Sequence, residues 1–401
     1  MRLVIIGAGF AGMYAALSAA RLREIQGVSP DELDIALVAP EPTLVVRPRL
    51  YEQNPETLTA PLLDVLKAID VSYVQGSVDT VETQSRMVRI ATAKGTKKTL
   101  SYDRLVVATG SRLFRPSIPG LAEHGFSVDS LDDAIALDKH LHGLAKRPTV
   151  NGRDTVVVAG GGFTGIEAAT EMPARLRAIL GPNAKTRVII VERNSAIAPD
   201  MGAGPRPVIE SALHKLGVET RLGAGVASLD ESGVTLSNGE HIETETVIWA
   251  AGIRAAPLTA QIPAERDNFG RLLVDPCLRV PGVEGVFATG DAARAACDDE
   301  GNYALMSCQH ATRMGAFAGN NAAAELLGVP TRPYHQKAYV TCLDLGEAGA
   351  LFTRGWDRKI EMVGDVAKKT KREINTVWIY PPKAERAAAL ASADPERVTS
   401  L

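Results

Sequence analysis

Short apolar runs alternate with helical stretches along the first half of the chain. Residues 2–7 (RLVIIG) form one such run, which enters a glycine-rich turn and continues as a helix from residue 13 onward. Residues 34–39 (DIALVA) form the next apolar run. Runs that are apolar throughout are typical of strands buried on both faces of a parallel sheet. The pattern predicts an α/β fold that begins with a strand–turn–helix–strand unit.

The same unit occurs a second time. Residues 154–160 (DTVVVAG) form an apolar run that enters another glycine-rich turn and a helix, and residues 187–192 (RVIIVE) follow. A single offset relates the two copies and places Ala39 on Glu192. An internal repeat of this kind indicates repeated structural units. Two complete units therefore predict two dinucleotide-binding sites.

Each glycine-rich turn has the spacing GxGxxG. The first glycine permits the tight turn, the second lets a pyrophosphate approach the backbone, and the third lets the helix pack closely on the strand. The helix N-terminus adds unpaired N–H groups and a partial positive charge for phosphates. The alternative, a glycine-rich turn without a ligand, is disfavoured by the second copy in register. The candidate cofactor-binding residues are Gly7, Gly9, Phe10, Ala11, Gly12, Gly160, Gly162, Phe163, Thr164 and Gly165.

The residue that ends the second strand of each unit bears on the choice of nucleotide. Glu192 ends this strand in the second unit, where a carboxylate accepts hydrogen bonds from adenosine ribose hydroxyls and repels a 2′-phosphate. NADH is therefore favoured, but Arg193 leaves NADPH open, and a solvated Glu–Arg pair is the alternative. The first unit has Ala39 instead, and Glu41 is the nearby substitute. A dinucleotide there is expected to bind somewhat loosely, because one hydrogen bond is lost.

Composition narrows the function classes. The 401 residues are 45% hydrophobic and 23% charged with a net charge of −3, an ordinary globular balance that does not favour nucleic-acid binding. Cys277, Cys297, Cys308 and Cys342 lack CxxC spacing and the histidines are scattered, so we expect neither a redox-active dithiol nor a metal site. No apolar run has the length of a membrane span, and residues 1–6 favour a strand over a signal peptide. We therefore expect a cytoplasmic protein.

Three further segments resemble those of pyridine-nucleotide flavoprotein reductases. Residues 285–293 (GVFATGDAA) predict a strand that enters a Gly-Asp turn and a helix, and residues 102–111 and 245–254 each predict an apolar strand closed by glycine. In that superfamily the acid of the first segment holds the ribityl chain of FAD. The resemblance assigns this role to Asp291 and FAD to the first glycine turn; the alternative is a helix N-cap. It adds Thr109, Gly110, Gly252 and Gly290 to the cofactor-binding candidates.

Other segments are similar to those of the type II NADH:quinone oxidoreductase branch. Residues 47–52 (RPRLYE) resemble its proline-containing segment beside the flavin, which makes Arg47 a cofactor-binding candidate. Residues 163–167 (FTGIE) resemble its second glycine motif, whose glutamate lies near the nicotinamide and the acceptor. Glu167 is thereby one catalytic candidate. The alternative is a glutamate favoured in the first helical turn by the helix dipole alone.

The quinone motif of this branch resembles residues 306–315 (MSCQHATRMG), which begin a helix expected to run to about Leu327. Gln309 matches the first of the motif's two glutamines and is the second catalytic candidate, whereas Arg313 replaces the other. Residues four apart share a helix face, so these two side chains are expected to line one wall. An arginine there favours an acceptor with a negative charge or a carboxylate over a neutral lipid quinone. The helix N-terminus would also stabilise negative charge on reduced flavin; capping and packing are the alternative for Gln309 and His310.

The last part of the chain differs in composition. Residues 338–346 and 348–353 predict a hairpin, and residues 368–382 mix basic and aromatic side chains. Residues 384–393 (AERAAALASA) lack the large apolar face that an interfacial anchor needs. Membrane contact is therefore expected to be absent or peripheral, and the basic residues 368–372 are interpreted as a solvated helix face.

The pattern and the resemblance together predict an α/β protein with two Rossmann-like domains and a C-terminal α+β interface region. The expected boundaries are 1–115 with 254–330 for a discontinuous FAD domain, 120–253 for the NAD(P)H domain and 331–401 for the interface region. The expected reaction is hydride transfer from NADH to flavin N5, followed by electron transfer to a quinone or a carboxylate-bearing small acceptor. Two alternatives are a reductase for a protein carrier such as ferredoxin or rubredoxin, and a slow redox-sensing flavoprotein. A homodimer is left open.

Overall fold

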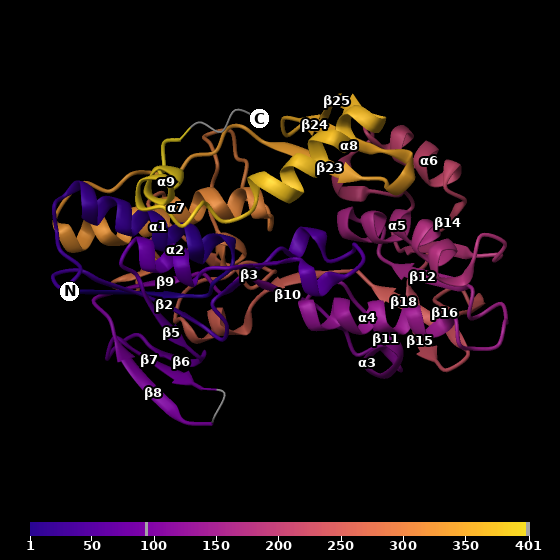
Figure 1. Ribbon diagram of the computed structural model, residues 1–401, viewed down its shortest axis with the longest axis horizontal. Helices are drawn as coiled ribbons and strands as arrows, with labels where there is room; N and C mark the ends of the chain where they lie inside the picture. The colour runs from indigo at the N-terminus through magenta and orange to yellow at the C-terminus, as the bar shows by residue number, and fades with distance from the viewer. Residues whose placement is uncertain (93–94, 398–401) are drawn as a thin grey trace.

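Two α/β units lie side by side in the computed structural model, which describes residues 1–92 and 95–397 (Figure 1). Each unit is built on a five-stranded sheet in which all neighbouring strands are parallel. The two Rossmann-like units predicted from the repeat are thereby confirmed. The first sheet has the order β21 (Val286–Ala288), β9 (Arg104–Val107), β1 (Arg2–Ile6), β2 (Asp34–Ala39) and β5 (Ser72–Gln75).

The second sheet repeats this arrangement with the other copy of the motif. Its central strand β12 pairs with β13 in the register that β1 has with β2, so the sequence repeat is also a structural repeat. The residues of β12 are all buried, as the continuous apolar run predicts. The order is β11 (Gly125–Phe126), β18 (Thr246–Trp249), β12 (Thr155–Ala159), β13 (Arg187–Glu192) and β14 (Val218–Leu222).

Helices α1 (Phe10–Ile25) and α7 (Cys308–Leu327) pack against each other on the first sheet, with their backbones close together (Figure 1). A Cβ atom on Gly315 would lie 2.3 Å from the carbonyl oxygen of Ala11, and one on Gly319 would lie 2.0 Å from that of Ala15. The absence of side chains at these two positions lets the helices approach closely. The expected end of α7 at about Leu327 is confirmed.

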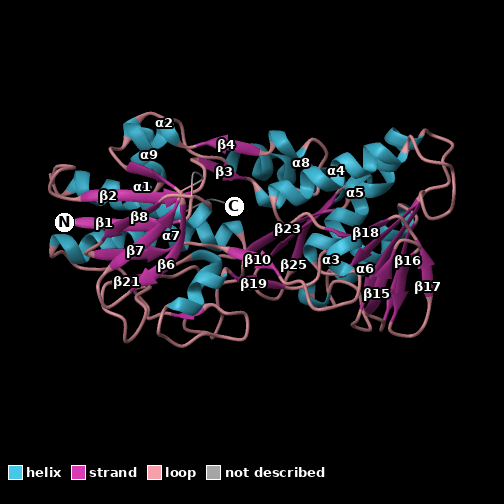
Figure 2. Cartoon of the chain, turned by 90° about the horizontal axis from the view of Figure 1, so that it is seen from below, coloured by secondary structure: helices cyan, strands magenta, loops and turns pink. Residues whose placement is uncertain are grey.

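Two short antiparallel strands connect the units. In β10 (Ser111–Leu113) and β19 (Ile253–Ala255), Ser111 lies opposite Ala255 and Leu113 lies opposite Ile253. Figure 2 shows this ribbon between the two larger sheets. The chain crosses from one unit to the other at both strands, so the ribbon fixes where the units meet.

Smaller elements complete the two units. The antiparallel strands are β3 (Thr43–Val45) with β4 (Thr59–Pro61), β6 (Ser77–Glu82) with β7 (Met87–Ala91) and β8 (Lys97–Ser101), and β15 (Val226–Asp230) with β16 (Gly233–Leu236) and β17 (His241–Glu243). A short parallel ribbon joins β20 (Leu272–Leu273) and β22 (Ala293–Arg294). The remaining helices of the units are α2 (Leu63–Ala68), α3 (Leu121–His124), α4 (Leu131–Leu144), α5 (Phe163–Leu180) and α6 (Arg206–Lys215).

One expected helix is absent. The Gly-Asp turn after β21 was predicted to lead into a helix, but Gly290–Ala292 form a single 3₁₀ turn that leads directly into β22. Residues 293–294 instead extend beside β20. The prediction of a helix after this turn is therefore wrong, although the strand before it is confirmed.

The C-terminal region contacts both units. The predicted hairpin is present as β23 (Val340–Asp344) and β24 (Ala350–Arg354), and β25 (Lys359–Val363) extends it to a three-stranded sheet. Helix α8 (Gly364–Glu373) packs on this sheet and leads into a π-helical turn at Ile374–Trp378. The chain then returns to the first unit, where α9 (Arg386–Ser392) packs on α1 (Figure 1). No helix of the described residues is both long and apolar enough to cross a membrane.

Candidate functional site

The first glycine turn connects β1 with α1 in a conformation that requires glycine. Gly7 has a φ of +110°. A Cβ atom on Gly12 would lie 1.8 Å from the carbonyl oxygen of Gly7, so only glycine lets α1 begin this close to the strand. A Cβ atom on Gly9 would meet no atom of the described chain within 4 Å. The second glycine therefore faces open space next to Phe10 and Ala11, which begin α1.

The second glycine turn has the same geometry. Gly160 has a φ of +119°, and a Cβ atom on Gly165 would lie 1.9 Å from its carbonyl oxygen. A Cβ atom on Gly162 would approach only an oxygen of Asp200, at 3.7 Å. Phe163 and Thr164 begin α5 immediately after this open position. Both turns thus present a helix N-terminus to free space, the arrangement that binds a pyrophosphate.

Glu192 lies at the end of β13 with its carboxylate directed at the second turn. Its Oε2 accepts a hydrogen bond from the Gly161 N–H at 2.7 Å, and its Oε1 accepts from the backbone and side chain of Asn194 at 2.8 and 2.6 Å. The carboxylate is therefore held beside the open glycine, where an adenosine ribose would lie. Arg193 is exposed.

Asp291 belongs to a polar cluster where the two units meet. The Ser111 hydroxyl donates to Asp291 Oδ2 at 2.5 Å, and Arg47 lies 3.9 Å from the same oxygen. Burial raises the pKa of the Asp291 carboxyl, while Ser111 and Arg47 act in the opposite direction. Arg47 itself donates mainly to Asp129, with one guanidinium nitrogen 2.5 Å from Asp129 Oδ1. It therefore links the segment after β3 to the start of the second unit.

The carboxyl ends of the first sheet carry buried hydroxyls without a partner in the described chain. These are Oγ1 of Thr109, which follows β9, and Oγ1 of Thr289, which follows β21. A buried hydroxyl without a hydrogen bond is costly, so both atoms favour a polar ligand at this edge. Together with Asp291 and the open Gly9, they fit a flavin dinucleotide. Gly110, Gly252 and Gly290 have φ values of +69°, +83° and +61°, which turn the chain at these strand ends.

Glu167 forms a buried ion pair that the sequence did not indicate. Lys371 Nζ donates to Glu167 Oε1 at 2.7 Å, and the Asp344 N–H donates to the same oxygen at 3.0 Å. Burial raises the pKa of the Glu167 carboxyl to about 7, although Lys371 opposes the shift. Burial lowers the pKa of Lys371, but the charge and hydrogen bond of Glu167, together with the charges of Cys342 and Asp344, make the net shift upward. Glu167 is therefore no solvated first-turn glutamate, and it can exchange a proton near neutral pH.

A second ion pair lies next to the first. Lys368 Nζ donates to Asp344 Oδ1, the Gly346 N–H donates to the same oxygen at 2.9 Å, and the Tyr51 hydroxyl donates to Asp344 Oδ2 at 3.1 Å. Lys368 and Lys371 belong to the basic run that was interpreted as a solvated helix face. For these two lysines that interpretation is wrong, because α8 turns them toward carboxylates between the two units.

The N-terminus of α7 lies between this charged cluster and the cofactor turn. Both Lys371 and Asp291 act electrostatically on the thiol of Cys308, the first residue of the helix. Gln309 follows it, half-buried, and its side chain makes no hydrogen bond within residues 1–92 and 95–397. The Nδ1 atom of His310 shares a hydrogen bond with the Ser307 hydroxyl at 2.9 Å. Cys308, the neighbour of Gln309 in the chain, is thus within electrostatic reach of both Lys371 and Asp291.

The side chain of Arg313 is bound by the C-terminal segments of the chain. Its Nε donates to the His335 carbonyl at 2.9 Å, and Nη1 donates to the Arg397 carbonyl at 3.0 Å. The guanidinium also lies 5.5 Å from the centre of the Phe317 ring. The guanidinium is thus bound by the C-terminal segments, and a wall shared with Gln309 stays a prediction. Arg313 thereby binds the C-terminal segments around His335 and Arg397, the tail of the chain, to α7.

The thiols of the site are not suited to disulfide chemistry. Burial raises the pKa of Cys308 to about 11 and that of Cys342 to about 12, so both are protonated at neutral pH. All four cysteines are free. A thiol–disulfide step is therefore not supported by this site.

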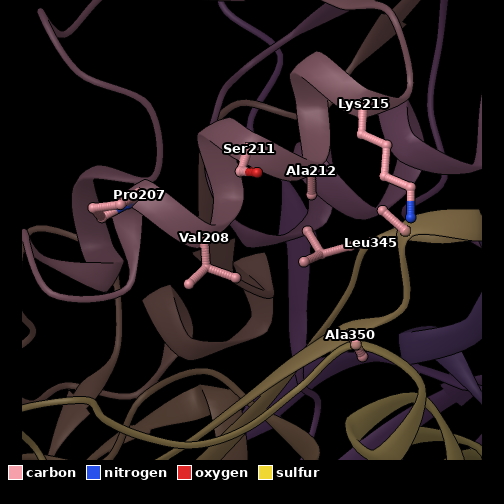
Figure 3. Close-up of a pocket in the computed structure, with 9 residues that line it drawn as sticks. Pro207, Val208, Ser211, Ala212, Lys215, Leu345 and Ala350 are labelled. Atoms are coloured by element: carbon pink, nitrogen blue, oxygen red, sulfur yellow. The ribbon is translucent and has the colours of Figure 1, made fainter.

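A surface groove of about 330 Å³ lies elsewhere, between α6 and the C-terminal sheet (Figure 3). Pro207, Val208 and Ser211 of α6 face Leu345 and Ala350 across it, with Lys215 at one end. None of the cofactor or catalytic candidates lines this groove, so it is separate from the site described above.

Comparison with known proteins supports this arrangement. Residues 1–315 match the family model described as pyridine nucleotide-disulphide oxidoreductase. An NADH dehydrogenase-like protein of Mycobacterium tuberculosis is 46% identical over 397 residues, which cover 98% of each chain. A demethylphylloquinone reductase of Synechocystis is 27% identical over 360 residues, covering 88% of this chain and 86% of that protein.

A solved structure has the same fold over nearly the whole chain. NDH2 from Plasmodium falciparum, determined in complex with NADH, superposes with a TM-score of 0.79 at 16% identity, covering 98% of this chain and 97% of that one. The family uses a flavin and a pyridine nucleotide, which agrees with the two glycine turns. The chain therefore belongs to the pyridine nucleotide-disulphide oxidoreductase family and, within it, to the NADH dehydrogenase-like oxidoreductases.

Proposed function

We propose that the protein is an FAD-dependent NADH:quinone reductase. The observation that carries the proposal is the buried Glu167–Lys371 pair beside the N-terminus of α7. It combines an acid that titrates near neutral pH with a cation at the junction of the two units. The Synechocystis relative, a demethylphylloquinone reductase, supports the same class of acceptor.

Each cofactor has its own turn in this proposal. FAD binds at Gly7–Gly12 with its ribityl chain at Asp291, and NADH binds at Gly160–Gly165 with its ribose at Glu192. NADH is preferred over NADPH because the fixed carboxylate repels a 2′-phosphate. When bound there, FAD would supply the hydride acceptor at N5 and the means to store two electrons for the acceptor.

Three side chains, those of Lys371, Glu167 and Gln309, then act on the acceptor. Electron transfer places negative charge on the quinone oxygens, and the ammonium of Lys371 stabilises that charge. Glu167 donates a proton to the developing hydroquinone, for which its raised pKa is suited. The free amide of Gln309 donates a hydrogen bond to a quinone carbonyl. Because Arg313 is bound to the tail, it gives no reason to prefer a carboxylate-bearing acceptor over a neutral quinone.

The test is a two-step anaerobic experiment on the purified holoprotein. NADH is first mixed with the protein and the bleaching of the flavin is recorded. Menadione, a small quinone, is then added. Reoxidation much faster than with air alone supports the proposal. Rapid reduction by NADH without reoxidation by menadione contradicts it.

A second candidate function is suggested by the ribbon between the units. Arg112 and Arg254 lie directly opposite each other on β10 and β19, both exposed, and the described chain offers neither an ion-pair partner. Like charges in this position are unfavourable without an external anion. The Arg254 guanidinium also lies 4.3 Å from the centre of the exposed Phe114 ring. An acidic protein electron carrier fits this surface. The test is whether the protein reduces a ferredoxin and whether raised salt slows this reduction.

The domain boundaries 1–115 with 254–330, 120–253 and 331–401 are retained as part of the proposal. A cytoplasmic location, peripheral or absent membrane contact and a homodimer stay predictions.

A further inference from the structure

Quinone reduction by NADH consumes a proton. NADH delivers a hydride, which contains two electrons and one proton, whereas a hydroquinone holds two protons, so the balance is NADH + quinone + H⁺ → NAD⁺ + hydroquinone. Ferricyanide takes the electrons alone: NADH + 2 Fe(CN)₆³⁻ → NAD⁺ + H⁺ + 2 Fe(CN)₆⁴⁻. If a buried acid serves the quinone, a route for protons must connect that acid with water.

Glu167 has little direct access to water. Its side chain is 5% exposed, and that of its partner Lys371 is 6% exposed. Both hydrogen bonds that the described chain donates to the carboxylate fall on Oε1. Oε2 is thus available to the acceptor. After Glu167 has given up its proton, the replacement must arrive through neighbouring groups.

The second ion pair is the outward neighbour. The Asp344 N–H donates to Glu167 Oε1 at 3.0 Å, so Asp344 is a direct neighbour of Glu167. The Asp344 side chain is 8% exposed, and that of its partner Lys368 is 22% exposed. Exposure therefore rises in steps from Glu167 through Asp344 to Lys368, all in one contiguous polar cluster between the units.

We propose that Asp344 and Lys368 form the proton inlet of the Glu167–Lys371 pair. Asp344 takes a proton from water when the partly exposed Lys368 side chain releases it. This proton moves on to Glu167, which has passed its own proton to the quinone. Asp344 returns to the carboxylate form and binds Lys368 again. The inference rests on the proposed function, because only an acceptor that consumes a proton needs an inlet.

The cluster around Glu167 holds several titratable and charged groups. Lys371 and Asp344 act on Glu167 directly, and the other titratable or charged groups of the cluster come from each element packed around it: Tyr51 and Glu52 from the segment between β3 and β4, Glu171 and Arg175 from α5, Cys308 from α7, Cys342 from β23 and Lys368 from α8. Among them Asp344 raises the pKa of Glu167 through its negative charge. The inlet and the donor are therefore electrostatically coupled.

The decisive variant is Asp344→Asn, which keeps the shape of the side chain and its hydrogen-bond acceptor but carries no proton. In the holoprotein, NADH:menadione turnover is expected to fall at least about tenfold, because a proton-transfer step contributes a factor of this size or more. NADH:ferricyanide turnover is expected to be unchanged. The solvent deuterium isotope effect on menadione reduction is expected to rise, since proton supply becomes rate-limiting. Asp344→Glu restores part of the menadione activity.

The matched control is Asp365→Asn. Asp365 is an exposed carboxylate on the first turn of the same helix α8, and this variant should reduce both acceptors as the wild type does. Equal losses with ferricyanide and menadione in Asp344→Asn would show a structural role and overturn the inlet. Unchanged menadione turnover in Asp344→Asn would overturn it as well.

A second measurement does not depend on turnover. Infrared titration of the carboxyl groups in the oxidised holoprotein, without NADH or acceptor, reports the midpoint of Glu167, identified by its loss in Glu167→Gln. Asp344→Asn should lower this midpoint, whereas Asp365→Asn should not. An unchanged midpoint would show that Asp344 and Glu167 are not coupled, and it would overturn the inlet. If wild-type protein fails to reduce menadione at all, the proposed function fails, and this titration still shows whether Asp344 and Glu167 are coupled.

Discussion

At the scale of single residues, the Glu167–Lys371 pair makes each partner dependent on the other. Glu167→Gln removes one charge and leaves the lysine buried without a counterion, which typically costs about 3–5 kcal/mol. Thermal unfolding of this variant should therefore show a clear loss of stability. The double variant Glu167→Gln with Lys371→Met should recover much of the loss, because no buried charge remains. If the double variant loses as much stability as the two single variants together, the pairing is contradicted.

Histidine protonation should make the protein less stable in mild acid. Burial lowers the pKa of His140 to about 4, and the charge of Arg147 acts in the same direction. The unfolded chain protonates a histidine near pH 6.5, so between about pH 6.5 and 4 it binds the extra proton and stability falls as the pH falls. His140→Gln, which keeps a partner for the Thr246 hydroxyl, should flatten this part of the stability profile.

The control for His140 is His241, which is exposed on β17. Between pH 6.5 and 4, the denaturant midpoint of His241→Gln should change with pH as steeply as that of the wild type. Burial also lowers the pKa of His310 to about 4. This histidine accounts for the pH dependence of stability that remains in His140→Gln. A profile of His140→Gln identical to that of the wild type would show that His140 is protonated equally in both states.

At the scale of elements, the contact of α1 with α7 is the feature most sensitive to a small change. A Cβ atom on Gly319 would lie 2.0 Å from a backbone carbonyl of α1, which cannot move as a side chain can. Gly319→Ala should therefore push the helices apart and cost about 1–3 kcal/mol in denaturant unfolding, with weaker retention of flavin by the turn that α1 begins. Gly143→Ala on α4, where the described chain leaves open space, should be neutral or slightly stabilising.

The elements show which parts of the structure could be predicted from sequence. The two sheets follow from local signals, since apolar runs and glycine spacing act within about thirty residues of the chain. The partners of Glu167 could not be predicted in this way, because Lys371 and Asp344 reach it only when a distant hairpin and helix pack against α5. Arg313 shows the same limitation: its helix position was predicted, but its direction depends on the tail. Lys371 shares a face of α8 with the buried Ala367, which is the one local sign that it turns inward.

At the scale of the whole molecule, the two units must be held so that two cofactors meet, and Arg47 spans that junction. It was predicted to bind cofactor, a role that stays a proposal. In the structure it donates to Asp129 of the second unit through two nitrogens, at 2.5 and 3.1 Å, and to Ser111 of the connecting ribbon at 3.1 Å. Arg47 therefore fixes the position of the second unit relative to the segment beside Asp291.

Asp129→Asn separates this orienting role from cofactor binding. It removes one charge from a partly buried pair but leaves Arg47 in place for the flavin. We expect a loss of about 1 kcal/mol, seen as a roughly fivefold higher KM for NADH, while the flavin content of the purified protein stays at the wild-type level. Arg47→Ala should raise the KM in the same way and, if Arg47 also contacts the flavin, lower the flavin content. Glu361→Gln, which breaks an exposed pair with Arg354 in the C-terminal sheet, is the control and should change neither quantity. A wild-type KM in Asp129→Asn would mean that the ribbon alone orients the units, and Arg47 would then act only on the flavin side.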